Sequence, residues 1–351
     1  MRPLNVRELP APPQGKVGWP WTTRSQQQPP KMRAGHRWPR ISIVTPSYNQ
    51  GLFIEETIRS VLLQGCPNIE YIIADGGSTD ETLEVVRKYD RWISYWVSEK
   101  DRGQADALRK GFNKATGRIL GWINADDLLA PSSLRTVAEA YSGHPEFGIY
   151  AGNVGNFTES PLESLELVKQ KNIDFINLLL PSSINRPRFH QPGIFFTSEL
   201  YRRSGGIDPR FYYRMDYDLL VRMLDNNGTV YYLDETLAYF RKHPFSKTGH
   251  RSFLYFAHVF EETNSVLRRY VNRFSDEEKN RARNKYLEGL LRGACYGLTE
   301  ADVSRATEEL VRAAFVGRLS LYRVVPQFIA QCALNRLFQL RDRRYPGSVA
   351  L

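Results

Sequence analysis

The 351-residue chain has few cysteines and no long apolar run. Its three cysteines, Cys66, Cys295 and Cys332, lie far apart, so they match neither a disulfide framework nor a zinc-binding spacing. No stretch of about 18 uncharged apolar residues occurs, so we expect neither a membrane-spanning helix nor a signal peptide. These absences favour a cytoplasmic protein that works in a reducing compartment.

The sequence also lacks the short motifs of several large enzyme classes. It contains no P-loop, no G-x-G-x-x-G fingerprint, no G-x-S-x-G elbow and no H-E-x-x-H helix. Their absence disfavours P-loop NTPases, ordinary dehydrogenases, α/β-hydrolases and zincin proteases.

Positive charge is concentrated at the two ends of the chain, whose formal net charge is +10. Residues 1–40 carry eight Lys/Arg against one Glu, and residues 311–351 carry seven Arg against one Asp. A nearly neutral body with basic ends suits an anionic membrane surface at least as well as nucleic acid. We therefore expect no nucleic-acid partner.

From Ile41 onward, short apolar strands alternate with segments of helical periodicity. Strands are predicted at 41–45, 71–74, 95–97, 119–123 and 148–151, and less clearly at 195–196 and 229–233. Helices are predicted at 53–64, 104–116 and 216–224, after a Ser78/Glu81 capping box, and after Pro131. This alternation predicts an α/β fold with a Rossmann-like, doubly wound, mostly parallel sheet, which binds ligands at the carboxyl ends of its strands.

Three regions are predicted. Residues 1–40, rich in Pro, Gln and Arg, read as a disordered or loosely docked basic arm. Residues 41–250 form the α/β domain, with a nucleotide-binding half to residue 150 and an acceptor-binding half after it. Residues 251–351 form a C-terminal helical extension, with capping boxes at Ser275/Glu278 and Thr299/Asp302.

Two polar clusters follow the first two predicted strands. Thr45-Pro-Ser-Tyr-Asn-Gln-Gly51 offers backbone donors beside a helix start, which suits a nucleotide, although the same residues also build ordinary turns. In Asp75-Gly-Gly-Ser-Thr-Asp80, a carboxylate at the strand end can accept the imide proton of a uracil. Ser78 and Asp80 can instead serve only the helix start.

A third cluster, Asn124-Ala-Asp126-Asp127, ends another predicted strand. Adjacent carboxylates repel each other unless a positive group lies nearby. Oxygen ligands of this kind suit Mg²⁺ or Mn²⁺, which bind carboxylates together with substrate phosphates. The alternative is an aspartate that caps the helix at Pro131.

Two further segments carry groups for catalysis. In Met215-Asp216-Tyr217-Asp218, one aspartate can cap the following helix while another acts as a general base. His243 lies in a loop rich in basic and hydroxyl residues, where a histidine either binds a metal or phosphate or is exposed and inert.

Taken in order, these clusters resemble the inverting glycosyltransferases of family 2, which have the GT-A fold. The resemblance covers roughly residues 41–250. It rests on Ile43-Val-Thr-Pro-Ser-Tyr-Asn-Gln, Asp75-Gly-Gly-Ser-Thr-Asp, Ser98-Glu-Lys-Asp-Arg-Gly-Gln104, Asn124-Ala-Asp-Asp, His190-Gln-Pro192, Gly205-Gly-Ile-Asp208, Met215-Asp-Tyr-Asp218 and Arg241-Lys-His-Pro-Phe-Ser-Lys-Thr248. Each motif is weak alone, but their shared order is specific.

The resemblance implies a role for each matching residue. The nucleotide-sugar donor would be bound by Pro46, Tyr48, Asn49, Asp75, Ser78, Gln104 and Asp126. Asp126, Asp127 and His243 would hold Mg²⁺ or Mn²⁺, and Asp216 would be the catalytic base. Because the first position of the aspartate motif is Asn124, we expect Asp127 to be the principal metal ligand.

The expected activity is metal-dependent transfer of one sugar, from a UDP-sugar by preference, to a hydroxyl of a glycan or lipid-linked acceptor in surface polysaccharide or glycoconjugate synthesis. The Q-x-x-R-W signature of processive members is missing, which favours single-sugar transfer. The alternatives are a sugar-nucleotide pyrophosphorylase, whose G-x-G-T-R loop is missing, and a non-catalytic carbohydrate- or nucleotide-binding relative.

Residues 315–340 combine apolar and arginine side chains around Pro326. This segment either lies on the inner face of an anionic membrane as a peripheral contact or packs as helices on the catalytic body. The sequence does not define the oligomeric state.

Overall fold

The computed structural model describes residues 4–32, 35–158, 165–180, 187–247 and 253–278. The chain divides into two compact units, residues 1–246 and 247–351. The first unit contains every strand of the described residues. In the second unit, the described residues form helix α8 (Phe253–Tyr270) and a following 3₁₀ turn.

One mixed sheet runs through the first unit, with strand order β3-β2-β1-β4-β8-β6-β9-β5 and β7 beside β6. The strands are β1 (Ile41–Ser47), β2 (Ile69–Asp75), β3 (Tyr95–Ser98), β4 (Ile119–Trp122), β5 (Leu128–Leu129), β6 (Ile149–Phe157), β7 (Glu166–Val168), β8 (Ile194–Thr197) and β9 (Val230–Arg241). The first four strands pair in parallel, and β8 joins them antiparallel. The mostly parallel α/β sheet predicted from the sequence is therefore confirmed.

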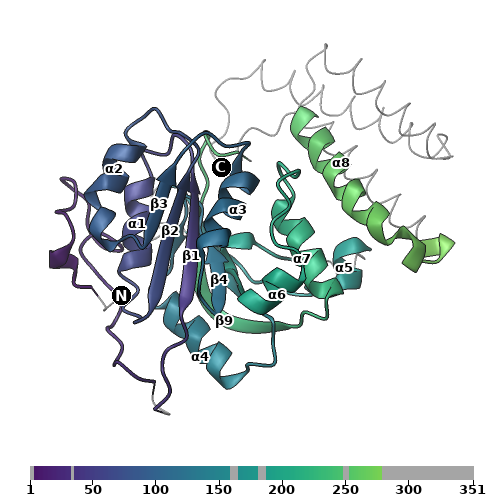
Figure 1. Ribbon diagram of the computed structural model, residues 1–351, viewed down its shortest axis with the longest axis horizontal. Coiled ribbons are helices and arrows are strands. Elements are labelled where there is room, and N and C mark those ends of the chain that lie inside the picture. The colour runs from purple at the N-terminus through teal and green to yellow at the C-terminus, as the bar shows by residue number, and fades with distance from the viewer. Residues whose placement is uncertain (1–3, 33–34, 159–164, 181–186, 248–252, 279–351) are drawn as a thin grey trace, which may run out of the picture. The chain divides into compact units, whose positions relative to one another are not determined.

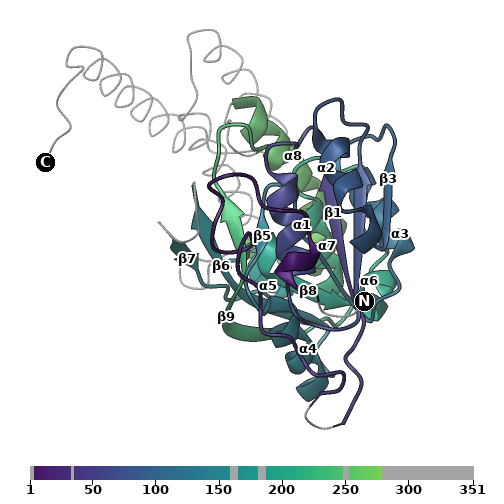
Figure 2. The same cartoon turned by 90° about the vertical axis from the view of Figure 1, so that its left-hand side faces the viewer.

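Helices cover both faces of the parallel strands (Figure 1). The α-helices described in the first unit are α1 (Ile54–Leu62), α2 (Thr82–Lys88), α3 (Gln104–Lys114), α4 (Ser133–Gly143), α5 (Phe175–Leu179), α6 (Ser198–Arg203) and α7 (Met215–Asp225). Helices α1 and α2 lie on one face of the sheet and α3 on the other, as Figures 1 and 2 both show. Both faces are covered, so β1, β2 and β4 are buried along their whole length, as parallel strands usually are.

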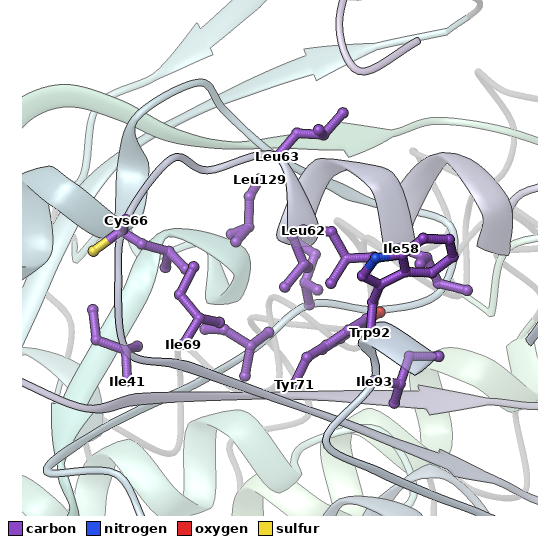
Figure 3. Packing of buried hydrophobic residues seen from close by; sticks show 14 of the residues in the cluster. Ile41, Ile58, Leu62, Leu63, Cys66, Ile69, Tyr71, Trp92, Ile93 and Leu129 are labelled. Carbon is purple, nitrogen blue, oxygen red and sulfur yellow. The ribbon is translucent and has the colours of Figure 1, made fainter. Parts of the chain in front are cut away.

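The core beneath α1 is built from alternate residues of the strands. Ile41, Ile69 and Tyr71 on the sheet face Ile58 and Leu62 on the helix, all buried (Figure 3). On the opposite face, Gly111 of α3 lies so close to Val44 that an added Cβ would approach its methyl carbon to 2.4 Å. This contact lets α3 pack closely against β1.

The later strands differ most from their predicted bounds. Strand β9 runs from Val230 to Arg241, far beyond the predicted 229–233, because Asp234 and Glu235 interrupt its apolar pattern without ending its pairing with β6. Strand β7 and helices α5 and α6 are short and were not predicted. The Ser78/Glu81 capping box was a wrong prediction: α2 begins at Thr82 without a side-chain cap, and Ser78 bonds elsewhere.

Residues 1–40 were predicted to be a disordered or loosely docked arm, and the structure describes residues 4–32 and 35–40 of it, which carry several buried side chains. Leu4, Leu9 and Trp19 are buried and belong to the same core as α1. Low periodicity concealed this packing, because an arm without regular secondary structure buries single large side chains rather than a repeating face.

In the second unit, the predicted capping box is present. Ser275 Oγ accepts the Glu278 N–H, and the Glu278 carboxylate accepts the Ser275 N–H at 2.9 Å. No helix among the described residues is long and apolar enough to cross a membrane. The predicted Thr299/Asp302 box and the 315–340 segment lie outside the described residues.

Candidate functional site

The loops that carry the predicted site leave the sheet at one edge. Strands β1, β2 and β3 end in register, with Ser47 opposite Asp75 and Asp75 opposite Ser98. Strand β4 pairs with β1 on its other side and ends at Trp122, two residues before Asn124. The clusters at 45–51, 75–80, 98–104 and 124–127 therefore meet at the carboxyl edge, where open α/β sheets bind ligands.

Asp75 organises the second loop from a buried position. Its Oδ2 accepts the N–H groups of Gly77 and Ser78, at 3.0 and 2.9 Å, and the hydroxyl of Ser98 at 2.7 Å. Its Oδ1 accepts the hydroxyl of Ser78 at 2.5 Å. Only 2% of the residue is exposed, so in this conformation Asp75 is largely engaged in shaping the loop.

The first loop is bonded to the second. The backbone N–H of Asn49 donates to Ser78 Oγ at 2.7 Å, and its side-chain oxygen accepts the Thr79 N–H at 2.9 Å. Asn49 has a left-handed φ of 51°, a conformation that asparagine tolerates better than most residues. Pro46 is buried in β1, whereas Tyr48 is 60% exposed and presents its ring beside these loops.

Two groups able to bind a divalent cation converge on the acidic loop. The Asp126 carboxylate and the His243 imidazole are 3.0 Å apart, with 18% and 8% of their side chains exposed. The imidazole ring packs 4.5 Å, centroid to centroid, from the ring of Phe53. His243 Nδ1 is buried and has no hydrogen-bond partner among the described residues.

Asp127 occupies a different environment from its neighbour. It is fully buried, its Oδ1 accepts the Arg241 N–H at 3.0 Å, and its Oδ2 accepts the Asn124 amide at 3.1 Å. Burial, followed by the Asp126 carboxylate, raises the pKa of Asp127 well above its ordinary value. Both oxygens of Asp127 therefore bond inward, whereas the Asp126 carboxylate is partly exposed.

Arg241 is a site residue that the sequence reasoning missed. Its Nε donates to the Asp126 carbonyl at 3.0 Å, and its Nη2 forms an ion pair with Glu56 at 2.8 Å. Its guanidinium lies between the rings of Phe53 and Phe157, at 5.2 and 4.5 Å. The available signal was its position two residues before the candidate histidine.

Gln104 joins the third loop to the acidic loop. Its side-chain amide donates to Asn124 Oδ1 at 2.8 Å, and Asn124 donates in turn to Asp127. Asparagine at the first position of the motif can donate and accept together, so it links these two side chains in a way that an aspartate could not.

Asp216 and Asp218 lie in the first turn of α7 but have different surroundings. Asp216 is partly exposed and lines a mostly apolar pocket with Trp122, Gln191 and Phe196. Asp218 is fully buried and forms an ion pair with Arg222 at 2.6 Å. Arg222 also donates to the carbonyls of Ser204 and Gly206, so Asp218 holds the α6–α7 connection together.

Together these features define an α/β domain with an acidic, histidine-containing site at the carboxyl edge of its parallel strands. Residues 42–204 match the family described as Glycosyl transferase family 2. These residues, a little under half of the chain, therefore form a glycosyltransferase family 2 domain.

A relative named a putative teichuronic acid biosynthesis glycosyltransferase, from Bacillus subtilis, is 39% identical over 92 residues, which is 25% of this chain and 36% of the relative. Two others, from Rickettsia typhi and Nostoc, are named as uncharacterized glycosyltransferases and are 28% and 24% identical over 60% and 58% of this chain. The chain spans 66% and 65% of their length, slightly less than two thirds.

Two solved structures share the fold. S. aureus TarS in complex with UDP-GlcNAc has a TM-score of 0.51 and 14% identity, over 78% of this chain and 89% of that one. The mannosyltransferase PcManGT from Pyrobaculum calidifontis, in complex with GDP-Man and Mn²⁺, has a TM-score of 0.51 and 20% identity, over 87% and 88%. At these identities the likeness shows the GT-A fold alone.

Proposed function

We propose that this protein transfers a single sugar from a nucleotide-diphosphate sugar to a hydroxyl acceptor, with inversion at the anomeric carbon and with help from a divalent cation. The observation that carries the proposal is the convergence of Asp126 and His243, 3.0 Å apart, at the edge where the nucleotide loops meet. A non-catalytic binding module would need neither this pair nor an aspartate such as Asp216 beside an adjoining pocket.

The donor would lie along the carboxyl edge of β1, β2 and β4. Tyr48, 60% exposed, offers a ring on which a base can stack. Pro46, Asn49, Asp75 and Ser78 would shape the base pocket, since they are bonded or buried within it. Oδ1 of Asp75 accepts a hydrogen bond from the Ser78 hydroxyl, and a carboxylate oxygen can accept a second one, here from the imide N–H of uracil. This capacity supports a uridine donor.

The residues at the acidic loop fit Mg²⁺ or Mn²⁺. Asp126 would supply oxygen and His243 nitrogen, but no group of three or more His, Cys, Asp or Glu gathers here or elsewhere among the described residues. A cation with few protein ligands completes its shell with diphosphate oxygens and water, as Mg²⁺ commonly does. When bound, it would offset the charge that develops on the departing diphosphate.

Asp216 would act as the base. It would remove the proton from the acceptor hydroxyl as that oxygen attacks the anomeric carbon and the bond to the diphosphate oxygen breaks. Asp216 is partly exposed and lines a small pocket with Trp122 and Phe196, so its carboxylate can be reached from one side. The printed name of the Bacillus relative supports an acceptor in cell-surface polysaccharide synthesis. The glycan or lipid-linked nature of the acceptor and a peripheral membrane contact remain parts of the proposal.

The test is binding of UDP-, GDP- and dTDP-sugars, each with Mn²⁺ and with EDTA, measured by thermal unfolding. One nucleotide class at about 100 times its Kd should stabilise the fold by ~2.7 kcal/mol, or roughly 5–10 °C for a domain of this size, and EDTA should abolish the shift. Asp216→Asn is the control, because it should keep donor binding and lose turnover. Well-folded protein that binds none of the three classes would overturn the proposal.

A further inference from the structure

The N-terminal arm, residues 4–32, precedes the residues that match the family yet packs into the core of the domain. Its backbone joins the end of α1: Ser25 N–H donates to Leu63 O at 3.0 Å and Gln28 N–H to Gly65 O at 2.9 Å. A Cβ added at Gly65 would lie 2.4 Å from Gln26 O. The chain after α1 is therefore shaped to accept the arm.

Arg59 of α1 shows how closely the domain depends on this arm. The residue is fully buried, and its guanidinium donates to the carbonyls of Pro10, Pro20 and Trp21 at 2.9, 3.1 and 2.8 Å. A further N–H donates to the Tyr89 hydroxyl at 3.0 Å. A buried cation needs such acceptors, and three of these four come from the arm.

The same helix holds the acidic loop with its other polar side chains. Thr57 Oγ1 donates to the carbonyls of Ala125 and Asp127 at 2.9 and 2.8 Å. One turn later, Ser60 Oγ accepts the Leu129 N–H at 3.1 Å, and Gln64 Nε2 donates to Ala130 O at 3.0 Å. Helix α1 therefore lies between the arm and the loop that carries Asp126.

The arm also contacts the segment after the acidic pair directly. The indole N–H of Trp19 donates to Leu129 O at 3.0 Å, and Ser25 Oγ accepts the Ser132 N–H at 2.8 Å. Trp19 is 7% exposed, so its bond is shielded from water. Ser132 has a left-handed φ of 64°, an unfavourable conformation for serine that surrounding contacts must hold.

We propose that the arm is a positioning element of the active site: through Trp19, Ser25 and Arg59 it fixes the 124–132 segment and thereby sets the affinity for the divalent cation and the donor diphosphate. The positioning of the segment stands on the contacts alone. The consequence for cation and donor rests on the proposed function.

Trp19→Phe tests this proposal, with Trp38→Phe as its matched control. Trp38 is 4% exposed, and its indole donates to Pro29 O at 2.8 Å, a carbonyl of the arm itself. Both substitutions remove one indole-to-carbonyl bond and leave an aromatic ring, but only the first removes a bond to the 124–132 segment. Ser25→Ala is a second variant with little loss of volume.

The first readout is backbone amide hydrogen exchange over 124–132, which needs no ligand. Trp19→Phe and Ser25→Ala should each speed exchange at Leu129 and Ser132 about fivefold, the equivalent of one ordinary hydrogen bond, while Trp38→Phe leaves these amides unchanged. Equal exchange rates at these amides in all variants, or equally faster exchange in Trp38→Phe, would refute the positioning role of the arm.

The second readout is the Mn²⁺ concentration that half-saturates UDP-sugar binding. It should rise about two- to fivefold in Trp19→Phe and Ser25→Ala and stay constant in Trp38→Phe, even where the melting temperatures fall alike. Faster exchange with unchanged half-saturation would refute the link to the cation. Wild-type protein that binds no nucleotide would refute the proposed function, while the exchange comparison would still decide whether the arm positions the loop.

Discussion

Replacing Asp126 and Asp127 one at a time by asparagine should separate a metal ligand from a structural carboxyl. Asp126 lies 3.0 Å from His243 and is partly open, whereas Asp127 is fully buried with both oxygens bonded inward. The two substitutions are chemically identical and adjacent in sequence. Any difference between them therefore reports on position rather than on the type of change.

The magnitudes follow from these contacts. Loss of an outer-shell partner commonly weakens metal binding by ~10–100-fold, so loss of the ligand Asp126 should weaken it by on the order of 100-fold or more. Asp127→Asn keeps an oxygen for the Arg241 N–H, so the affinity should stay within about tenfold. Its disturbed bond to Asn124 should instead cost about 1–3 kcal/mol of unfolding free energy.

Titration of Mn²⁺ followed by electron paramagnetic resonance measures the free ion directly, and urea unfolding supplies the stability. We expect Asp126→Asn to lose the cation with near-normal stability, and Asp127→Asn to show the reverse. Equal loss of Mn²⁺ affinity in both variants, on folded protein, would refute the inward role of Asp127 and restore it as a ligand.

Two further predictions concern groups outside the metal site. Arg222→Met should lower the unfolding free energy by about 3–5 kcal/mol, because it leaves the buried Asp218 carboxylate unpaired. Arg202→Met, on the surface of α6, should change it by less than about 0.5 kcal/mol. Similar urea midpoints for the two variants would contradict this prediction. Burial, and then the charge of Lys242, lowers the pKa of His190 to about 4. Between pH ~6.5 and 4 this histidine is therefore protonated mainly in the unfolded chain, so the folded state loses stability as the pH is lowered. Wild type should therefore lose ~2 kcal/mol more than His190→Gln between pH 7 and pH 5, and parallel losses in urea titrations would contradict the assignment.

The sequence was sufficient to predict the first half of the sheet because each of its strands contains a short apolar run and a helical pattern follows it. Strands β1 and β4 began where the apolar runs predicted, and β2 and β3 were located within two residues. The second half was harder to predict because Asp234 and Glu235 interrupt the apolar pattern of β9 and β7 has only three residues.

The site shows the same division. The strand-end position of Asp75, Asp126 and Asp127 followed from where their strands stop. Their different burial did not, because it depends on Arg241, more than a hundred residues later, whose N–H reaches Asp127. Contacts between residues so far apart in sequence leave no periodic signal, and the arm carbonyls around Arg59 escaped prediction for the same reason.

The most direct test of the account is proton NMR of a UDP-sugar with α configuration incubated with the protein and Mn²⁺ in the absence of acceptor. Water should then replace the acceptor, so UDP should appear together with free sugar whose first-formed anomer is β. Asp216→Asn, which keeps the nucleotide site, should slow this release about 10²–10⁴-fold. Release of the α anomer, or release at an equal rate from the variant, would contradict inverting transfer with Asp216 as its base.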